Sequence, residues 1–462
     1  MGIYGAINSA TSGLSAQATA LENISGNVAN SQTTGYKRLD TTFADLVSGG
    51  GATQASQVAG TTFATSRATN TIQGDISDSA VDTYMAINGD GYFVVTSAAD
   101  VVDGQTTFAD DSYYTRAGDF EIDEDGYMVN RSGYYLMGYQ LDPATGNPIG
   151  DATGVIQIDD QPIPAKKTTS IDYQANLPPV PATTRYDGAD PASALLDPAI
   201  VTADIPNTQT DIFRESSISA GSKTVYNENG TGLNVDVRWA KTANADPAAL
   251  PTAIEDTWSM YVSSGGAGTD DWLQVGSATF DGAGDLSGLT AGSVGTVSVS
   301  GDGFDVASLT VGNTTLTGLN LDFGTDLTQF SANSSIASSV ALSQDGYAAG
   351  EIVGISIDES GRINASYSNS QSRALYEIPL AEFDAEQELR RVNGSAFAAT
   401  PTSGEATLTA SGAVLANSLE LSNADIADEF SKLIITQQAY SANSKIITSA
   451  DEMLDSALNM VR

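Results

Sequence analysis

The C-terminal stretch Asn423–Arg462 reads NADIADEFSKLIITQQAYSANSKIITSADEMLDSALNMVR. Stepping along it by alternate fours and threes gives a nearly continuous apolar line. The positions on this line are Ile426, Phe430, Leu433, Gln437, Tyr440, Ser444, Ile447, Asp451, Leu454, Leu458 and Val461. An apolar repeat of about 3.5 residues keeps one seam of a helix facing a partner helix. The stretch therefore predicts a long helix in a coiled coil.

The N-terminal stretch, residues 3–28, shows the same repeat. Its positions are Ile3, Ile7, Ala10, Leu14, Gln17, Leu21, Ile24 and Val28, and only the glutamine is polar. At about 1.5 Å of rise per residue, the C-terminal helix would be roughly 55 to 60 Å long, which is longer than a globular domain needs. Each helix could pack only against its own domain. Heptad repeats at both ends of the chain instead favour pairing of the two helices with each other or with helices of other copies.

Composition excludes several classes of function. The 462 residues include 19 basic and 57 acidic side chains, and this net charge of -38 repels nucleic acid and anionic membranes. Cysteine and histidine are both absent, which excludes a thiol nucleophile, an imidazole base, a Cys/His zinc site and a disulfide. The length suggests about three domains, and the 41% of hydrophobic residues is enough for ordinary cores.

The acidic motifs offer little support for chemistry. The turn Asp123-Glu124-Asp125-Gly126 resembles a calcium loop, but the bidentate glutamate of a 12-residue loop is missing, so we interpret it as a hairpin turn. A glycosidase needs two carboxyl groups at a fixed spacing in a cleft, which no sequence can show. We predict that the chain is not an enzyme and that it has no catalytic, cofactor-binding or metal site.

Targeting signals point in two directions. Residues 1–20 lack the basic start and apolar core of a secretory signal, and no run of about 18 apolar residues spans a membrane. These two tests alone predict a cytoplasmic protein. The acidic middle, rich in Thr, Ser and Gly, looks like an extracellular surface, and export without a cleaved signal would resolve the conflict.

Between the terminal helices the hydrophobic period changes to two. We expect hairpins at residues 86–95, around Asn-Gly-Asp-Gly, and at 120–129, followed by an aromatic strand at 134–141. Prolines crowd into residues 162–206, and short strands separated by glycine turns follow. Residues 350–363 resemble 120–128, because both segments have alternating apolar residues followed by an acidic turn that ends in glycine. One sheet is therefore predicted to combine segments from both sides of an inserted domain.

The predicted fold class is α+β and multidomain, with terminal α-helices forming a coiled coil and nested all-β domains between them. The predicted parts are an N-terminal helix of the inner core domain (1–35), an extended connector (36–70), the first part of an inner β domain (71–167), an inserted outer β domain (168–338), the second part of the inner β domain (339–393), a return connector (394–415) and the C-terminal helix of the core domain (416–462).

Three segments resemble a known family. The run Asn27-Val28-Ala29-Asn30-Ser31-Gln32-Thr33-Thr34-Gly35-Tyr36-Lys37, after a Ser-Gly-Leu-Ser-Ala helix, resembles the N-terminal signature of bacterial flagellar rod and hook proteins. The C-terminal stretch, with Gln-Gln-Ala-Tyr at 437–440 and Asp-Glu-Met-Leu at 451–454, looks like their shared terminal helix. In the middle, 345–350 and 367–371 are similar to a segment typical of the hook members, although Ser370 stands where glycine is usual.

This resemblance implies a structural subunit of the flagellar hook, polymerising head to tail into a flexible curved tube that transmits torque from rod to filament. Its implied partners are other copies of itself, the distal rod, hook cap and hook-filament junction proteins, and the type III export apparatus. The implied location is the extracellular hook, reached without a cleaved signal peptide. The alternatives are a distal rod or junction subunit, or an acidic extracellular carbohydrate-binding or hydrolytic protein.

The candidate site is an assembly interface. We predict that it contains Ile7, Leu14, Leu21, Ile24, Val28, Asn27, Asn30, Thr33, Gly35, Tyr36, Lys37, Phe430, Leu433, Tyr440, Ile447, Leu454 and Leu458. Asn30 and Gly35 are expected to shape the turn after the first helix. Tyr36 and Lys37 are expected to reach a neighbouring subunit or the C-terminal helix of the same chain.

Overall fold

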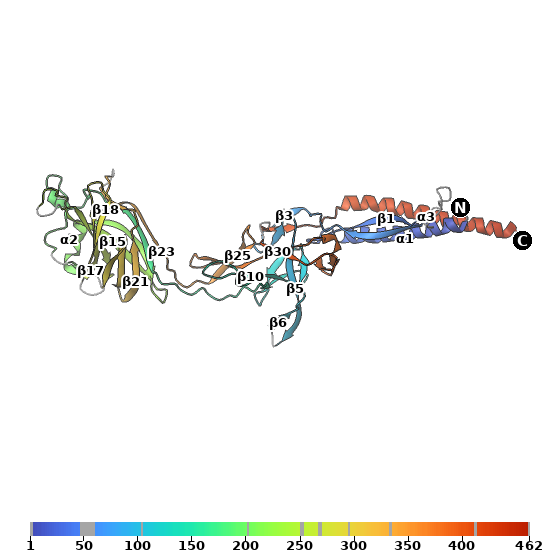
Figure 1. The fold of residues 1–462 in the computed structure, drawn as a ribbon, viewed down its shortest axis with the longest axis horizontal. Helices are drawn as coiled ribbons and strands as arrows, with labels where there is room; N and C mark the ends of the chain where they lie inside the picture. Colours follow the sequence, from blue (N-terminus) through green and yellow to red (C-terminus); the bar gives the residue numbers. More distant parts are fainter. Residues whose placement is uncertain are drawn as a thin grey trace. The chain divides into compact units, whose positions relative to one another are not determined.

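The chain forms two compact units in a computed structural model that describes residues 3–46, 61–102, 105–200, 203–249, 254–266, 270–293, 296–331, 335–410 and 414–460. Unit 1 comprises Met1–Gln161 and Ile352–Arg462, and unit 2 comprises Pro162–Glu351. Both terminal helices belong to unit 1, and mostly β parts lie between them in the sequence, so the α+β multidomain class is as predicted (Figure 1). Among the described helices, none is long and apolar enough to cross a membrane.

The two long helices of unit 1 are α1 (Ile3–Ala29) and α3 (Ile426–Met460). They lie side by side, as the blue and red helices of Figure 1 show. Helix α3 begins directly after Asp425, whose carboxylate accepts a hydrogen bond of 2.7 Å from the backbone N–H of Ala427. The predicted start of this helix at residue 416 is therefore wrong, because residues 414–416 and 418–420 are strands.

In the described parts of the predicted connector at 36–70, the chain forms a two-stranded ribbon instead, and residues 47–60 lie outside the described residues. Strands β1 (Leu39–Leu46) and β2 (Thr61–Ala68) pair antiparallel along their whole lengths. The ribbon packs on α1, where the Asn23 side-chain amide donates 2.8 Å hydrogen bonds to the hydroxyls of Thr41 and Ser66. Polar and small residues, mainly Thr, Ala and Asp, interrupt any apolar period in these strands, so a search for hydrophobic patterns did not detect the ribbon.

The inner β region of unit 1 is a large sheet whose main path is β24-β25-β26-β10-β5-β7-β29-β28. Its described strands are β5 (Tyr92–Val102), β6 (Gln105–Phe108), β7 (Tyr113–Thr115), β8 (Phe120–Ile122), β9 (Met128–Asn130), β10 (Tyr134–Gln140), β11 (Gly154–Val155), β24 (Ile352–Ile357), β25 (Arg362–Tyr367), β26 (Ser372–Glu377), β27 (Pro379–Glu382), β28 (Arg390–Arg391), β29 (Ala396–Ala398) and β30 (Thr407–Ala410). A short 3-10 helix, η4 (Glu386–Glu388), precedes β28. The β26–β10 pairing joins segments from the two sides of unit 2, as the repeated strand style predicts.

Two predictions about this region need correction. The run Asn88–Gly91 does not close a hairpin, because β4 (Met85–Ile87) pairs with β31 (Val414–Ala416) while β5 pairs elsewhere. The return connector at 394–415 contains strands of the large sheet, and β3 (Ile76–Asp78) pairs with β32 (Ser418–Glu420). Both errors come from long-range pairing partners that local turn signals cannot specify.

Other local signals in unit 1 were reliable. The β8–β9 hairpin forms, and the Asp123 carboxylate accepts backbone hydrogen bonds from Asp125 and Tyr127 at its turn. The aromatic strand appears as β10, close to the predicted bounds. The core beneath the sheet is apolar and includes Phe93, Phe120 and Leu136, which are all fully buried.

Unit 2 is a sandwich of two sheets. One contains β12 (Ser170–Asn176), β19 (Val297–Ser300), β20 (Gly303–Val311), β21 (Thr314–Asp322), β22 (Leu327–Thr328) and β23 (Ser338–Gln344). The other contains β13 (Ile205–Pro206), β14 (Ile218–Tyr226), β15 (Gly232–Ala243), β16 (Asp256–Ser263), β17 (Asp270–Phe280) and β18 (Leu286–Ala291). The helical turns η2 (Pro191–Ala194), η3 (Asn207–Gln209) and α2 (Thr210–Glu215) complete the unit.

The core of unit 2 lies between these sheets and is organised around Trp239, Trp258 and Phe304. The indole N–H of Trp239 donates to the Tyr173 hydroxyl at 2.9 Å. Strand β23 pairs with β12, so it belongs to unit 2, whereas the sequence boundary at 338 assigned it to the inner β domain. The serines around this boundary resemble a linker, but the alternation of Val340 and Leu342 continues the sandwich.

Candidate assembly interface

Helices α1 and α3 run antiparallel in a fixed register. The Asn27 side-chain amide donates a 3.0 Å hydrogen bond to the Glu429 carboxylate. Fourteen residues earlier in α1, a Cβ on Gly13 would lie only 2.8 Å from the side-chain nitrogen of Asn443. Each step back along α1 thus matches one step forward along α3, and the helices approach closely where one of them has no side chain.

The buried face of α1 consists mostly of small residues. Its buried residues are Ala10, Gly13, Ala16, Ala20, Asn23, Ile24 and Asn27. Ala10 and Ile24 were on the predicted seam, but Leu14, Leu21 and Val28 are only half-buried, as is Ile7. At four places the buried residue comes one position before the predicted one, so the large apolar side chains lie at the edge of the contact.

Helix α3 shows the same one-residue shift. Its buried residues are Glu429, Thr436 and Ala450, each one position before the predicted Phe430, Gln437 and Asp451. Of the other predicted positions, Leu433, Ile447 and Leu454 are half-buried, whereas Tyr440 and Leu458 are exposed. The heptad period was correct, but the small residues rather than the large ones form the seam within the chain.

A set of large apolar side chains, spread over more than one face of α3, remains uncovered by this pairing. We call it the α3 apolar surface, and its members are Ile426, Phe430, Ile434, Ile435, Tyr440, Ile446, Met453, Leu458 and Met460, each at least 42% exposed. Single exposed apolar residues are ordinary on protein surfaces, but a concentration on one helix marks an interaction site.

The turn after α1 is shaped as predicted by Asn30 and Gly35. The Asn30 side-chain amide donates to the Gly26 carbonyl at 2.9 Å, and its oxygen accepts from the Thr33 hydroxyl at 3.2 Å. Gly35 has a φ of 63°, and a Cβ there would lie 2.5 Å from the backbone nitrogen of Ala117. Only glycine fits this left-handed, crowded position.

Tyr36 and Lys37 stay within the chain. The Tyr36 hydroxyl donates to the Asn27 side-chain oxygen at 3.3 Å, and its ring lies 4.7 Å from the Arg391 guanidinium carbon. The Lys37 ammonium, only 1% exposed, donates to the Glu420 carboxylate at 2.6 Å and to the Ile72 carbonyl at 2.7 Å. Both residues therefore fasten the end of α1 to its own unit.

Lys37 belongs to a junction cluster with the buried Arg116, Glu420 and Tyr92 and the half-buried Glu386. The Glu420 carboxylate also accepts from Arg116 at 3.3 Å, and the Tyr92 hydroxyl donates to Glu386 at 3.1 Å. Burial lowers the pKa of Lys37 below its usual 10.5, although Glu420 acts in the opposite direction. Burial also raises the pKa of Glu386 and, together with the Glu386 charge, that of Tyr92.

The sequence reading missed Glu420 because its strand inverts the expected pattern. In Ser418-Leu-Glu-Leu, alternation would bury both leucines, yet Glu420 is fully buried and Leu421 is 43% exposed. Asn423, also missed, accepts a 2.7 Å hydrogen bond from the backbone N–H of Arg38 and donates to Thr69. Lys37 could have indicated Glu420 in the sequence. A lysine that becomes buried needs a carboxylate partner, so an acidic residue had to lie near it.

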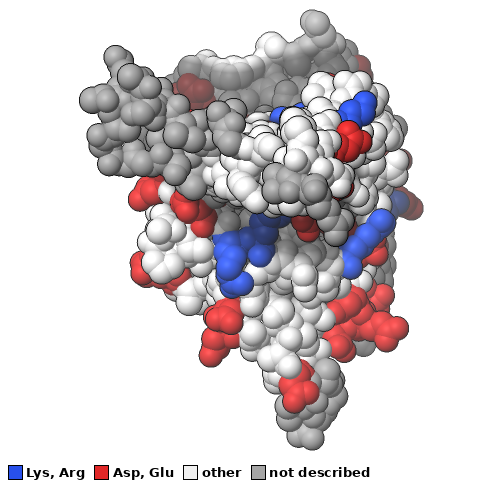
Figure 2. Space-filling view, turned by 90° about the vertical axis from the view of Figure 1, so that its right-hand side faces the viewer, with Lys and Arg blue, Asp and Glu red and all other residues white. Residues whose placement is uncertain are grey.

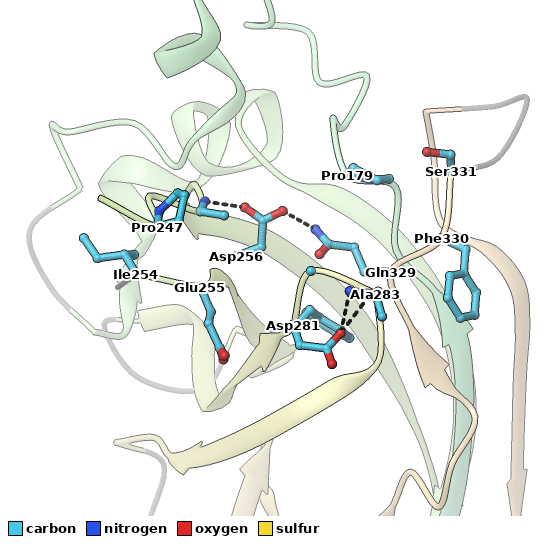
Figure 3. Close-up of a pocket in the computed structure, with 14 residues that line it drawn as sticks. Pro179, Pro247, Ile254, Glu255, Asp256, Asp281, Ala283, Gln329, Phe330 and Ser331 are labelled. Atoms are coloured by element: carbon cyan, nitrogen blue, oxygen red, sulfur yellow. Dashed lines mark hydrogen bonds between the residues drawn. The ribbon is translucent and has the colours of Figure 1, made fainter. Parts of the chain in front are cut away.

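Unit 2 has a pocket of about 500 Å3, shown in Figure 3. Its carboxylates are engaged in local structure: Asp256 accepts from the Gln329 side-chain amide at 2.9 Å and from Lys241 at 2.9 Å. The backbone N–H groups of Asp285, Ala283 and Gly284 lower the pKa of Asp281. A general acid needs a raised pKa, so this arrangement suits a turn rather than catalysis.

Four family models match the chain. They are the flagella basal body rod protein model (7–37), the flagellar hook protein FlgE/F/G D1 domain (86–175), the flagellar basal body protein FlaE D2 domain (191–347) and the flagellar basal body rod FlgEFG protein C-terminal model (415–460). The matched segments thus include most of α1, all of α3, the strands of the inner sheet before unit 2 and most of the sandwich.

Similar proteins extend over the whole chain. The flagellar hook protein FlgE of Brucella suis is 30% identical, with 100% of each chain covered, and that of Salmonella typhimurium is 29% identical, with 98% of each covered. The crystal structure of Helicobacter pylori flagellar hook protein FlgE2 covers 75% of this chain and 99% of its own, at 16% identity and a TM-score of 0.49, which does not by itself assign a fold. The chain belongs to the flagellar hook protein FlgE family.

Proposed function

We propose that the chain is a structural subunit of the bacterial flagellar hook, polymerising head to tail into a curved tube that transmits torque. The observation that carries this proposal is the α3 apolar surface, which stays exposed after α1 and α3 have paired. Heterologous contacts between copies do not close into a ring, so they generate a helical polymer. Membership of the FlgE family supports this reading over a rod or junction subunit or a carbohydrate-active protein.

The predicted interface residues divide into two roles under this proposal. The large apolar side chains contact neighbouring copies: Ile7, Leu14, Leu21, Val28, Phe430, Tyr440 and Leu458, with Ile24, Leu433, Ile447 and Leu454 shared between the internal seam and its edge. Asn27, Asn30, Thr33, Gly35, Tyr36 and Lys37 instead fix the direction in which the helix pair leaves the sheet. Their hydrogen bonds within the chain support this positioning role.

The proposed setting is extracellular. Export through the type III apparatus, followed by contacts with the distal rod, hook cap and hook-filament junction proteins, would place the chain in the hook. The absence of cysteine suits a chain that forms no disulfide on this route. Non-enzymatic function is consistent with the structural role of the family and with the engaged carboxylates of unit 2.

A charge on the exposed face of α3 tests the proposal without disturbing the fold. Ile435 is 67% exposed, so Ile435→Asp should leave the helix pair intact and prevent tube formation, because the aspartate would be buried between copies. Gln438→Asp, at an exposed polar position of the same helix, is the control. Negative-stain microscopy of purified protein and of hooks in a complemented deletion strain measures the result. Normal tubes from Ile435→Asp would contradict the assigned role of this surface.

A further inference from the structure

The last turns of α3 form an apolar, acidic tip. In the register set by Asn27 and Gly13, the first residue of α1, Ile3, lies opposite Met453. Among the described residues, the tip beyond that point, residues 454–460, therefore has no α1 residue opposite it. Leu458 is 68% exposed and Met460 is 83% exposed.

Within the described residues 451–460, this end of α3 has acidic side chains and no basic one. Asp451, Glu452 and Asp455 lie in or beside it, and the last turn of the described helix has no basic residue. The tip therefore favours contact with a surface that combines apolar side chains with cations.

Such a surface lies at the other end of the helix pair. A groove of about 520 Å3 runs between α1, α3 and the β1–β2 ribbon, and it is lined by Ile24, Arg38, Asp40, Phe43, Arg67 and Lys432 among others. Phe43 is 47% exposed and offers an apolar contact. Everything in this groove belongs to unit 1.

The groove is unusual in its charge. It holds three of the 19 basic residues in a chain with 57 acidic ones. Figure 2 shows how sparse Lys and Arg are beside the more widespread Asp and Glu on one face of the molecule. Within the groove, Asp40 lies 3.5 Å from Arg38 and 3.4 Å from Lys432, and the Glu429 carboxylate is buried and paired with Lys432 at 2.8 Å. Three cations against two carboxylates leave a positive excess.

We propose that the tip of α3 from one copy docks into this groove of a second copy. The inference rests on the proposed hook function and identifies the contact that joins copies head to tail. Along α3, Leu458 lies about 40 Å from Lys432 at 1.5 Å of rise per residue. Copies displaced by about that distance along the helix axis bring tip and groove together, and the contact repeats without closing.

Disulfide trapping tests the contact, because the chain contains no native cysteine. The full chain carrying Leu458→Cys and Phe43→Cys should give a ladder of covalent multimers when assembled tubes are oxidised. Each single variant, and a mismatched pair of Leu458→Cys with Thr11→Cys on the exposed face of α1, should give none. A dimer from Leu458→Cys alone, or an equal ladder from the mismatched pair, would overturn the inference.

Charge exchange provides a second readout. Arg67 is exposed and donates to the Gln387 side chain at 3.1 Å, so Arg67→Glu is compatible with the fold. Arg67→Glu or Asp455→Arg alone should raise the concentration needed for assembly by at least about tenfold, and the two together should restore it. Normal assembly of both single variants, or tubes without the disulfide ladder, would overturn the docking site and leave the hook function standing. A failure of the unmodified chain to form tubes would overturn the proposed function itself.

Discussion

At the scale of single residues, Glu420 decides how the chain ends are attached. Its carboxylate holds Lys37 from the segment after α1 and Arg116 from the inner sheet, while its strand leads to α3. One buried side chain therefore ties both terminal segments to the sheet. Among the described residues, Glu420 is the only carboxylate that forms an ion pair with Lys37 or Arg116.

Replacing Glu420 by Gln should destabilise unit 1 by about 3 to 5 kcal/mol, because Lys37 and Arg116 would stay buried without their carboxylate. Urea unfolding followed by far-UV circular dichroism measures the change. The control is Glu121→Gln, since Glu121 is exposed and 4.0 Å from the exposed Arg131, and the glutamine oxygen can still accept the 2.6 Å hydrogen bond from the Tyr84 hydroxyl. It should cost less than about 1 kcal/mol. Equal effects of the two substitutions would mean that the junction cluster contributes little.

Asp345 makes the stability of unit 2 depend on acid pH. Burial acts to raise its pKa, but hydrogen bonds from the backbone N–H groups of Ser170 and Thr169, with the Lys166 ammonium 3.1 Å away, lower it well below the usual 3.8. The unfolded chain then binds a proton more readily than the folded one. The contribution is present above about pH 4 and is lost as the pH falls through the folded pKa.

Asp345→Asn should therefore destabilise unit 2 at neutral pH, with a difference from the unmodified chain that shrinks as the pH falls below about 4. Tryptophan fluorescence during urea unfolding reports on this unit, since all three tryptophans, Trp239, Trp258 and Trp272, lie in it. A difference that stayed constant from pH 7 to pH 3 would show that the carboxylate charge is not the cause.

At the scale of elements, the sequence predicted which helices pair but not which faces they use. The seven-residue period was visible in both terminal stretches, and the seam was predicted at the large apolar residues, mainly Leu and Ile. Close packing instead selected Ala10, Gly13, Ala20 and Thr436, because small side chains let two helices approach and gain dispersion contacts along their length. Hydrophobicity identifies a face that is buried somewhere, but it cannot say whether the partner is the same chain.

Gly13→Leu should therefore separate the helices and destabilise the pair by about 1 to 3 kcal/mol, as overpacking does. Gly5→Leu is the matched control, because a Cβ at Gly5 meets nothing within 4 Å and leucine is a better helix former than glycine. Thermal unfolding followed by circular dichroism of the two variants should show opposite shifts. A stabilising effect of Gly13→Leu would show that the seam has room that the contact with Asn443 does not suggest.

At the scale of the whole molecule, the sequence predicted the nested order of helices and β regions but placed several boundaries wrongly. Turn residues and the change in composition predicted an inserted domain. A cluster of prolines marked its start, close to Pro162, where unit 2 begins. The ribbon at β1–β2, the pairing of β4 with β31 and the membership of β23 depend on partners far away in the sequence. A local pattern specifies that a strand exists, whereas the pairing depends on the assembled sheet.

Excising unit 2 tests how far the two units are independent. The chain enters and leaves this unit at neighbouring places, because the backbone N–H of Ile163 donates to the Gly350 carbonyl at 2.8 Å. A short linker from Gln161 to Ile352 should then leave the sheet and the helix pair folded, since the α1–α3 contacts lie wholly in unit 1. We expect the shortened chain to keep its helical circular dichroism and to form tubes whose curvature differs from that of the full chain. Electron microscopy measures both. Monomers from the shortened chain, alongside normal tubes from Ile435→Asp in the full chain, would move the assembly contacts from the helices to unit 2 and reverse the assignment of roles.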